Sequence, residues 1–162
     1  MTKKRSRPRL ARTGAVATAL ALAALLSAGC GGGSDPAKGL AGDVGKARDA
    51  QAFSALSQAL VAAGLVRAES GGTYGSGPAD LAQKLQAHDP SIQFTTTPST
   101  GPEQIQVLVG GPVLVLVARS PSNAYLAVWQ SGGQTLYYRG DQAPTFTGDK
   151  PAGPGWGAAP PA

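Results

Sequence analysis

The hydrophobic positions of the chain follow a helical spacing up to about residue 90 and a strand spacing after it. Between residues 43 and 70 the larger apolar residues recur every three or four positions, and small ones flank them: Phe53, Leu56, Leu60 and Ala63, with Ala52, Ala59 and Val66 alongside. Asp43 is a suitable N-cap, and Gly71 and Gly72 end the pattern. The spacing predicts one long amphipathic helix over residues 43–70, which needs a partner for its apolar stripe.

A second, shorter helix is predicted after a glycine-rich loop. Pro78 is suited to the first helical position, because its missing N–H has no intrahelical partner there. Leu81 and Leu85 share one face at a spacing of four residues, and the Asp89-Pro90 step ends the helix.

From residue 91 the apolar residues alternate, as in strands. The runs cover residues 91–97 (a short lead-in strand), 103–109, 113–118, 124–130 and 135–139. The run 113–118 is apolar on both faces, which predicts a central strand, and the short connections favour antiparallel hairpins. We therefore expect an α+β domain over residues 43–140, with one long N-terminal helix packed on a small three- to four-stranded antiparallel sheet. Residues 141–162 are rich in Pro, Gly and Ala, which predicts a disordered tail.

The N-terminal residues 1–29 have the three parts of a secretory signal peptide: basic residues 3–12, apolar residues 14–26 and small residues 27–29. The formal net charge of +5 depends on this N-terminal segment, which holds six of the fourteen Lys and Arg residues. From residue 30 onward eight basic residues face nine acidic ones, so the net charge of the remainder is near −1. A nucleic-acid partner is not expected, because its phosphates need cations on the folded domain.

The only cysteine, Cys30, follows this segment in the sequence Leu-Ser-Ala-Gly-Cys. The stretch resembles the lipobox of bacterial lipoproteins. The resemblance implies cleavage between Gly29 and Cys30, a lipid on the Cys30 thiol, and attachment to the outer face of the cell membrane. Two alternatives are an ordinary signal peptide with a free thiol and an uncleaved anchor. Residues 30–42 are glycine-rich and predict a flexible tether between membrane and domain.

The order of elements resembles the globular part of type IV pilins and pseudopilins. The resemblance covers roughly residues 47–140. It rests on five stretches in order: D-A-Q-A-F-S-A-L-S-Q-A-L-V-A-A, G-T-Y, L-A-Q-K-L-Q-A-H-D-P-S-I-Q-F, S-T-G-P-E-Q-I-Q-V, and V-L-V-A-R-S-P-S-N-A-Y-L-A-V. It implies a pilin-like fold and a role beside a type IV pilus or secretion system. The chain lacks the Gly-Phe-Thr-Leu-x-Glu type of cleavage site and the long apolar helix of pilins, so the resemblance does not imply a pilus subunit.

No motif for catalysis, metal binding or phosphate binding stands out. The single histidine, His88, ends the short helix beside Asp89, where the helix dipole favours a cation. The acidic residues are scattered, no glycine run has the form of a phosphate-binding loop, and no G-x-S-x-G sequence occurs. We expect a protein without catalytic residues, metal ligands or cofactor.

Aromatic residues of the last two strands form a candidate docking face. If the aliphatic side of residues 124–130 meets the helix, Tyr125 and Trp129 point outward, and Tyr137 joins them if the strand register allows. The alternative is that the tail covers these side chains, with Trp156 as the covering residue.

Two functions follow from these patterns. The first is a non-enzymatic, lipid-anchored module that docks an envelope protein of unknown identity. The alternative is a lipoprotein that binds a small ligand or the cell wall. An exposed aromatic sheet face favours the first, and a concave apolar pocket with convergent polar groups favours the second.

Overall fold

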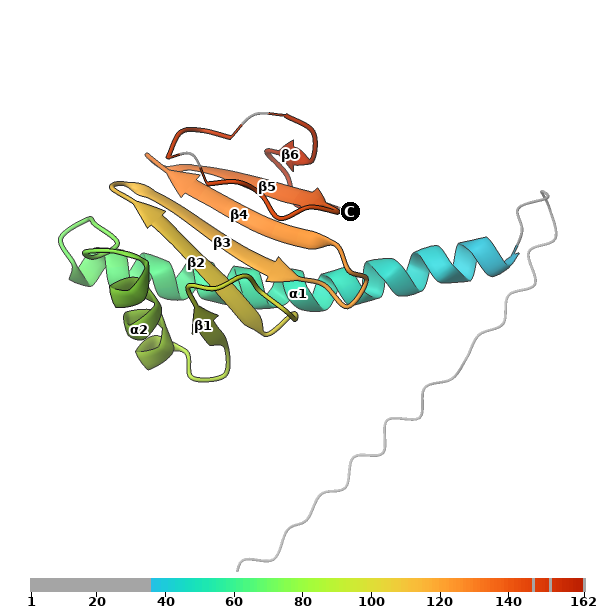
Figure 1. Ribbon diagram of the computed structural model, residues 1–162, viewed down its shortest axis with the longest axis horizontal. Helices are drawn as coiled ribbons and strands as arrows, with labels where there is room; N and C mark the ends of the chain where they lie inside the picture. The colour runs from blue at the N-terminus through green and yellow to red at the C-terminus, as the bar shows by residue number, and fades with distance from the viewer. Residues whose placement is uncertain (1–35, 147, 152, 162) are drawn as a thin grey trace, which may run out of the picture. The chain divides into compact units, whose positions relative to one another are not determined.

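The computed structural model describes the backbone of residues 36–146, 148–151 and 153–161, and side chains from residue 44 onward. Within these ranges the domain has two helices and one sheet of six strands (Figure 1). The elements are α1 (Pro36–Glu69), α2 (Pro78–His88), β1 (Gln93–Thr95), β2 (Gln104–Gly110), β3 (Val113–Arg119), β4 (Tyr125–Ser131), β5 (Gln134–Gly140) and β6 (Trp156–Gly157). The predicted α+β class is confirmed, and the sheet has more strands than the sequence predicts.

Helix α1 begins seven residues before the predicted start at Asp43 and ends one residue before the predicted end. Residues 36–42, which were predicted as part of a tether, belong to this helix. Adding residues to the end of an existing helix costs less free energy than nucleating a new one. At the other end Gly71 adopts φ 67°, a left-handed conformation that glycine tolerates, and the Gly72 N–H donates to the Arg67 carbonyl at 2.8 Å. No helix among the described residues is long and apolar enough to cross a membrane.

Helix α2 has the bounds that the sequence predicts. Pro78 is its first residue, His88 is its last, and Leu81 and Leu85 are fully buried. The side chain of Gln86 donates to the Ile92 carbonyl and accepts the Phe94 N–H. These bonds fix the start of the sheet against the end of α2.

The strands lie in the sheet in sequence order, from β1 to β6. The four long strands β2–β5 pair with their neighbours in sequence as antiparallel hairpins, as predicted. Two short strands extend the sheet at its edges: β1 pairs parallel with β2, and β6 pairs antiparallel with β5. The sheet therefore has more strands than the three or four predicted, and the β1–β2 pair is parallel where antiparallel pairing was predicted. The sequence spacing carries no signal for β6, since two residues are too few to show alternation.

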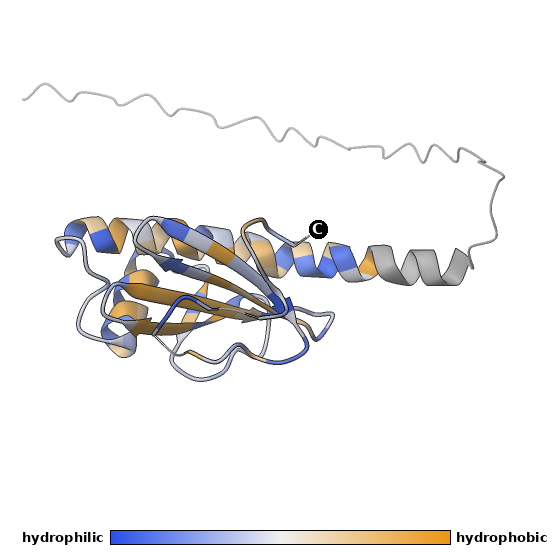
Figure 2. Cartoon of the chain, turned by 90° about the horizontal axis from the view of Figure 1, so that it is seen from above, coloured by the Kyte–Doolittle hydropathy of each residue, from blue (hydrophilic) through white to orange (hydrophobic). Residues whose placement is uncertain are grey.

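The central strand β3 is buried on both faces, as its unbroken apolar sequence predicts. On one face Leu114, Leu116 and Ala118 meet the apolar stripe of α1, and Figure 2 shows the hydrophobic strands lying along this helix. On the other face Val113, Val115 and Val117 form a second cluster with Ala127 and Trp129. The sheet therefore has a hydrophobic core on each side.

The predicted disordered tail covers this second cluster. Phe146 and Trp156 pack against it, and the Trp156 ring lies 5.1 Å from the Tyr138 ring between centroids. Gly155, at φ 87°, accepts the Arg139 N–H at 3.0 Å, and a Cβ at this position would lie 2.6 Å from the Arg139 carbonyl oxygen. Only glycine allows this approach. The tail has little regular structure, but its apolar side chains cover this face of the sheet, as a layer of helices or strands would in other folds.

Candidate functional site

The predicted docking residues do not form one exposed face. Trp129 lies under the tail and is only 4% exposed. Tyr125 borders the same cluster, half-buried, with the Arg119 guanidinium 5.7 Å from its ring centroid. Tyr137 points to the opposite face, because it pairs with Val128 rather than Trp129. The register thus places Leu136 and Tyr138, not Tyr137, on the side of Trp129. The structure favours the covered alternative for this face.

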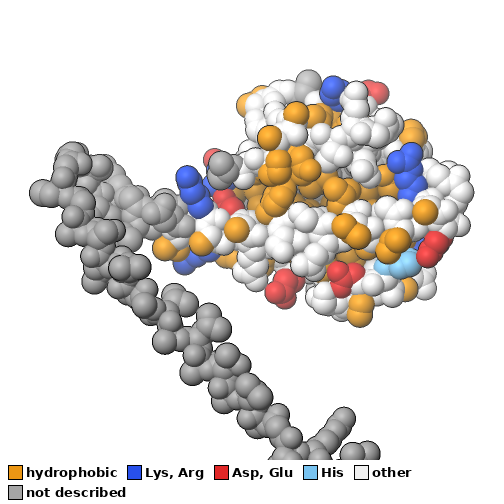
Figure 3. Space-filling view, turned by 180° about the vertical axis from the view of Figure 1, so that it is seen from behind, with side chains coloured by type: hydrophobic (Ala, Val, Ile, Leu, Met, Phe, Trp, Pro, Cys, Tyr) orange, Lys and Arg blue, Asp and Glu red, His pale blue; other side chains and the backbone are white. Residues whose placement is uncertain are grey.

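An apolar groove lies on the other face, between α1 and β5. Helix α1 packs on β2, β3 and β4 but reaches β5 only through long side chains. One of these is Phe53, whose ring lies 5.6 Å from the Tyr137 ring between centroids. Figure 3 shows hydrophobic side chains gathered in a hollow above α1. We call this hollow the α1–β5 groove; it encloses about 320 Å³ and is lined by Lys46, Asp49, Ala50, Phe53, Ser54, Leu126, Arg139 and Pro161.

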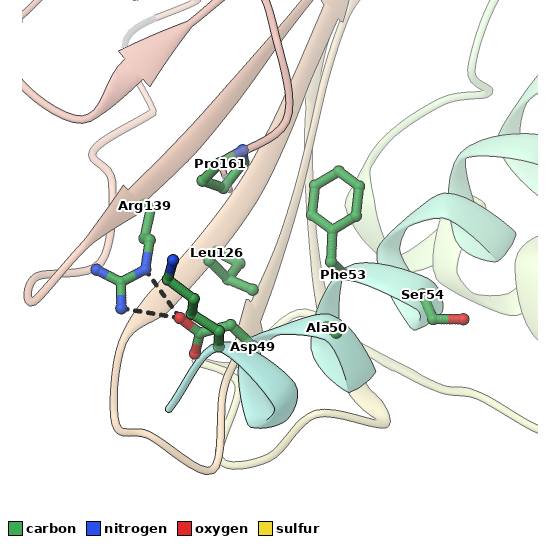
Figure 4. Close-up of a pocket in the computed structure, with 8 residues that line it drawn as sticks. Asp49, Ala50, Phe53, Ser54, Leu126, Arg139 and Pro161 are labelled. Atoms are coloured by element: carbon green, nitrogen blue, oxygen red, sulfur yellow. Dashed lines mark hydrogen bonds and ion pairs between the residues drawn. The ribbon is translucent and has the colours of Figure 1, made fainter. Parts of the chain in front are cut away.

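One end of the groove is closed by a polar cluster around Asp49 (Figure 4). The Asp49 carboxylate accepts bonds from Nε and Nη2 of Arg139, both at 2.8 Å. Its other oxygen accepts the hydroxyls of Ser120 and Ser122, both at 2.5 Å. The two serines belong to the turn between β3 and β4, in which Asn123 adopts φ 68°, a conformation that asparagine tolerates. The cluster ties α1 to β5 and to the β3–β4 turn.

These bonds set the ionisation of Asp49. Burial by itself would raise the pKa of this carboxyl, but the hydroxyls of Ser120 and Ser122 and the Arg139 guanidinium outweigh it. The pKa of Asp49 is therefore lower than its ordinary value of 3.8. The carboxylate is charged at neutral pH, and its acceptors are already used by neighbouring donors.

The Asp49→Asn variant should be less stable than the native protein by about 1–3 kcal/mol at pH 7, because hydrogen bonds to a charged group are lost. A lowered pKa stabilises the fold above the ordinary pKa of 3.8, and this contribution disappears as the pH falls through the folded-state pKa. Urea unfolding should thus show the two proteins converging below pH 3.8. Asp141→Asn, at an exposed position, is the control. An unchanged difference between Asp49→Asn and native protein in acid would contradict this account.

None of the described side-chain bonds joins His88 to the Asp49 cluster. Its Nε2 atom is 3.0 Å from the Glu69 carboxylate at the end of α1. Among the residues that the structure describes, no three His, Cys, Asp or Glu side chains are placed to hold a metal ion. Gly29 and Cys30 lie outside the described residues.

Sequence reasoning missed the groove residues. Asp49 and Arg139 are separated by 90 positions, and neither lies in a motif. The only local signal was Phe53, an aromatic residue at the margin of the helix stripe, which the structure leaves half-buried. No family model matches the chain, and neither the curated proteins nor the solved structures include a match.

Proposed function

We propose that the chain is a lipid-anchored envelope protein whose domain docks an apolar segment of another protein in the α1–β5 groove. The anchor is the lipid on Cys30 that the lipobox resemblance implies, and it holds the domain on the outer face of the cell membrane. The order of a long helix, a short helix and antiparallel hairpins supports a pilin-like fold. A role beside a type IV pilus or secretion system is part of this proposal.

The observation that carries the docking role is the combination, in the groove, of open apolar surface with an Asp49 carboxylate whose acceptors are already used. The half-buried Phe53 and the exposed Ala50 offer apolar surface, and Leu126, which is 1% exposed, completes the lining. Asp49 and Arg139 are bound to each other, and Asp49 also to two serines. A guest therefore gains by covering apolar surface, and an acidic group on it could also pair with Lys46, which is exposed in the same lining.

A small ligand is the second candidate, because the volume of about 320 Å³ is at the lower end of known ligand pockets. Small-ligand sites orient their guests with free, convergent polar groups. Here Asp49 is already paired, and the cations Lys46 and Arg139 are exposed rather than converging inside the groove, so the groove suits a protein segment better.

The anchor is tested by the Cys30→Ser variant in the native organism. Without a thiol no lipid can be attached, so labelling with a radioactive fatty acid should be lost. The protein should also leave the membrane fraction or remain unprocessed. A Cys30→Ser protein that is processed to the native size and stays in the membrane would refute the lipid anchor.

Docking is tested by placing a photo-cross-linking amino acid at Ala50, an exposed residue of the groove. The matched control position is Gln58, which is also exposed on α1 but lies beside His88 and Asp89 on the other flank. A discrete envelope protein should be cross-linked from position 50 and not from position 58. Phe53→Ala should reduce this product. Equal products from both positions would contradict docking in the groove.

A further inference from the structure

Residues 158–161 leave the sheet after β6, and Pro161 lies at the α1–β5 groove. Strand β6 pairs Gly157 with Tyr137. The chain then bends at Ala158 and Ala159, and Pro161 lies in the wall of the groove, which also holds Leu126 and Arg139 (Figure 4). The end of the chain thus passes from the edge of β5 to the side of the sheet that carries α1.

The segment after β6 does not pair with β5. The chain bends at Ala158 and Ala159, and Pro160 and Pro161, which have no backbone N–H, cannot resume the ladder beyond the bend. None of the hydrogen bonds among the described residues involves residues 158–161. Apolar contact is what remains to hold Pro161, which is half-buried, at the groove.

The groove has the chemistry that extended, proline-containing segments bind. Such segments are preformed and lose little conformational entropy on binding, and they dock on aromatic surfaces. Phe53 lines the groove together with Leu126 and Pro161, and its ring is packed at a tilt against Tyr137.

We propose that the α1–β5 groove binds an extended apolar segment that contains proline, and that Pro161, carried there by residues 158–160, covers part of it as an intramolecular competitor. This inference rests on the proposed docking function and names the chemistry of the partner. A segment attached to the same chain acts at an effective concentration of about millimolar, so it weakens a partner's binding without abolishing it. Removing the segment frees the groove.

The test uses a fluorescein-labelled peptide with the sequence of residues 157–162, Gly-Ala-Ala-Pro-Pro-Ala, and measures fluorescence polarisation. A chain truncated after Gly157 should bind this peptide about tenfold or more tightly than the full chain does, because the competing segment has been removed. Phe53→Ala in the shortened chain should remove this gain, whereas Gln58→Ala should keep it. A peptide with alanine in place of both prolines should bind more weakly.

Equal binding to the full and shortened chains, or no binding to a folded shortened chain, would overturn the inference. If the shortened chain does not fold, Pro161→Lys in the full chain replaces it, since an ammonium group beside Lys46, Arg139 and the apolar lining should release the segment. This variant should bind the peptide about tenfold or more tightly than the native chain, as expected of the shortened chain. If it binds the peptide no more tightly than the native chain does, the inference is also overturned. A cross-linked partner from position 50 together with a peptide that fails to bind would refute only the competitor, not the docking function.

Discussion

Leu56→Asp should prevent the domain from folding. Leu56 is fully buried in the core between α1 and the sheet. Loss of a buried leucine side chain costs about 2–5 kcal/mol, and burying a carboxylate without a partner adds to it. The total reaches the stability of an ordinary domain, about 5–15 kcal/mol. Far-UV circular dichroism and urea titration of the purified variant should show loss of the cooperative transition.

The control is Gln58→Asp, two residues along the same helix. Gln58 is exposed, and its only described side-chain bond is to Ser54 at 3.4 Å. Its replacement should change the free energy of unfolding by less than about 1 kcal/mol. Similar losses in both variants would show that the buried face of α1 is assigned incorrectly.

Trp129→Ala should cost about 3–5 kcal/mol of stability, the usual loss for a buried aromatic side chain. Trp129 is 4% exposed, although it stands on the face of the sheet away from α1, because Phe146 and Trp156 join the cluster around it. The midpoint of thermal unfolding should fall accordingly. A stable Trp129→Ala variant would mean that the tail leaves this face open, and the outer face would again become the candidate docking surface.

Trp156→Phe is the matched control, since it keeps an aromatic ring against Tyr138. It should unfold near the native midpoint. It also leaves Trp129 as the single tryptophan, because the chain has two. Its emission should be that of a buried indole and should shift to the red when the protein unfolds.

The sequence by itself determined the elements that depend on local spacing. The stripe from Ala52 to Val66, the proline start of α2 and the two apolar faces of β3 all predict what the structure contains. These signals are readable because burial of one face imposes a period of 3.6 or 2 on the sequence. The secretory and lipobox pattern around Cys30 lies outside the described residues and stays a prediction.

Tertiary structure decided which surfaces are open. Whether Tyr137 lies beside Trp129 depends on the register of β4 and β5, and a shift of one residue would reverse its face. The covering of Trp129 by Trp156 and the meeting of Asp49 with Ser120 and Arg139 join residues far apart in the chain. Such contacts leave no periodic trace in a single sequence, because they depend on how the elements pack and not on their own spacing. The groove between α1 and β5 arises in this way, from a helix that covers three strands of the sheet and leaves the next one open.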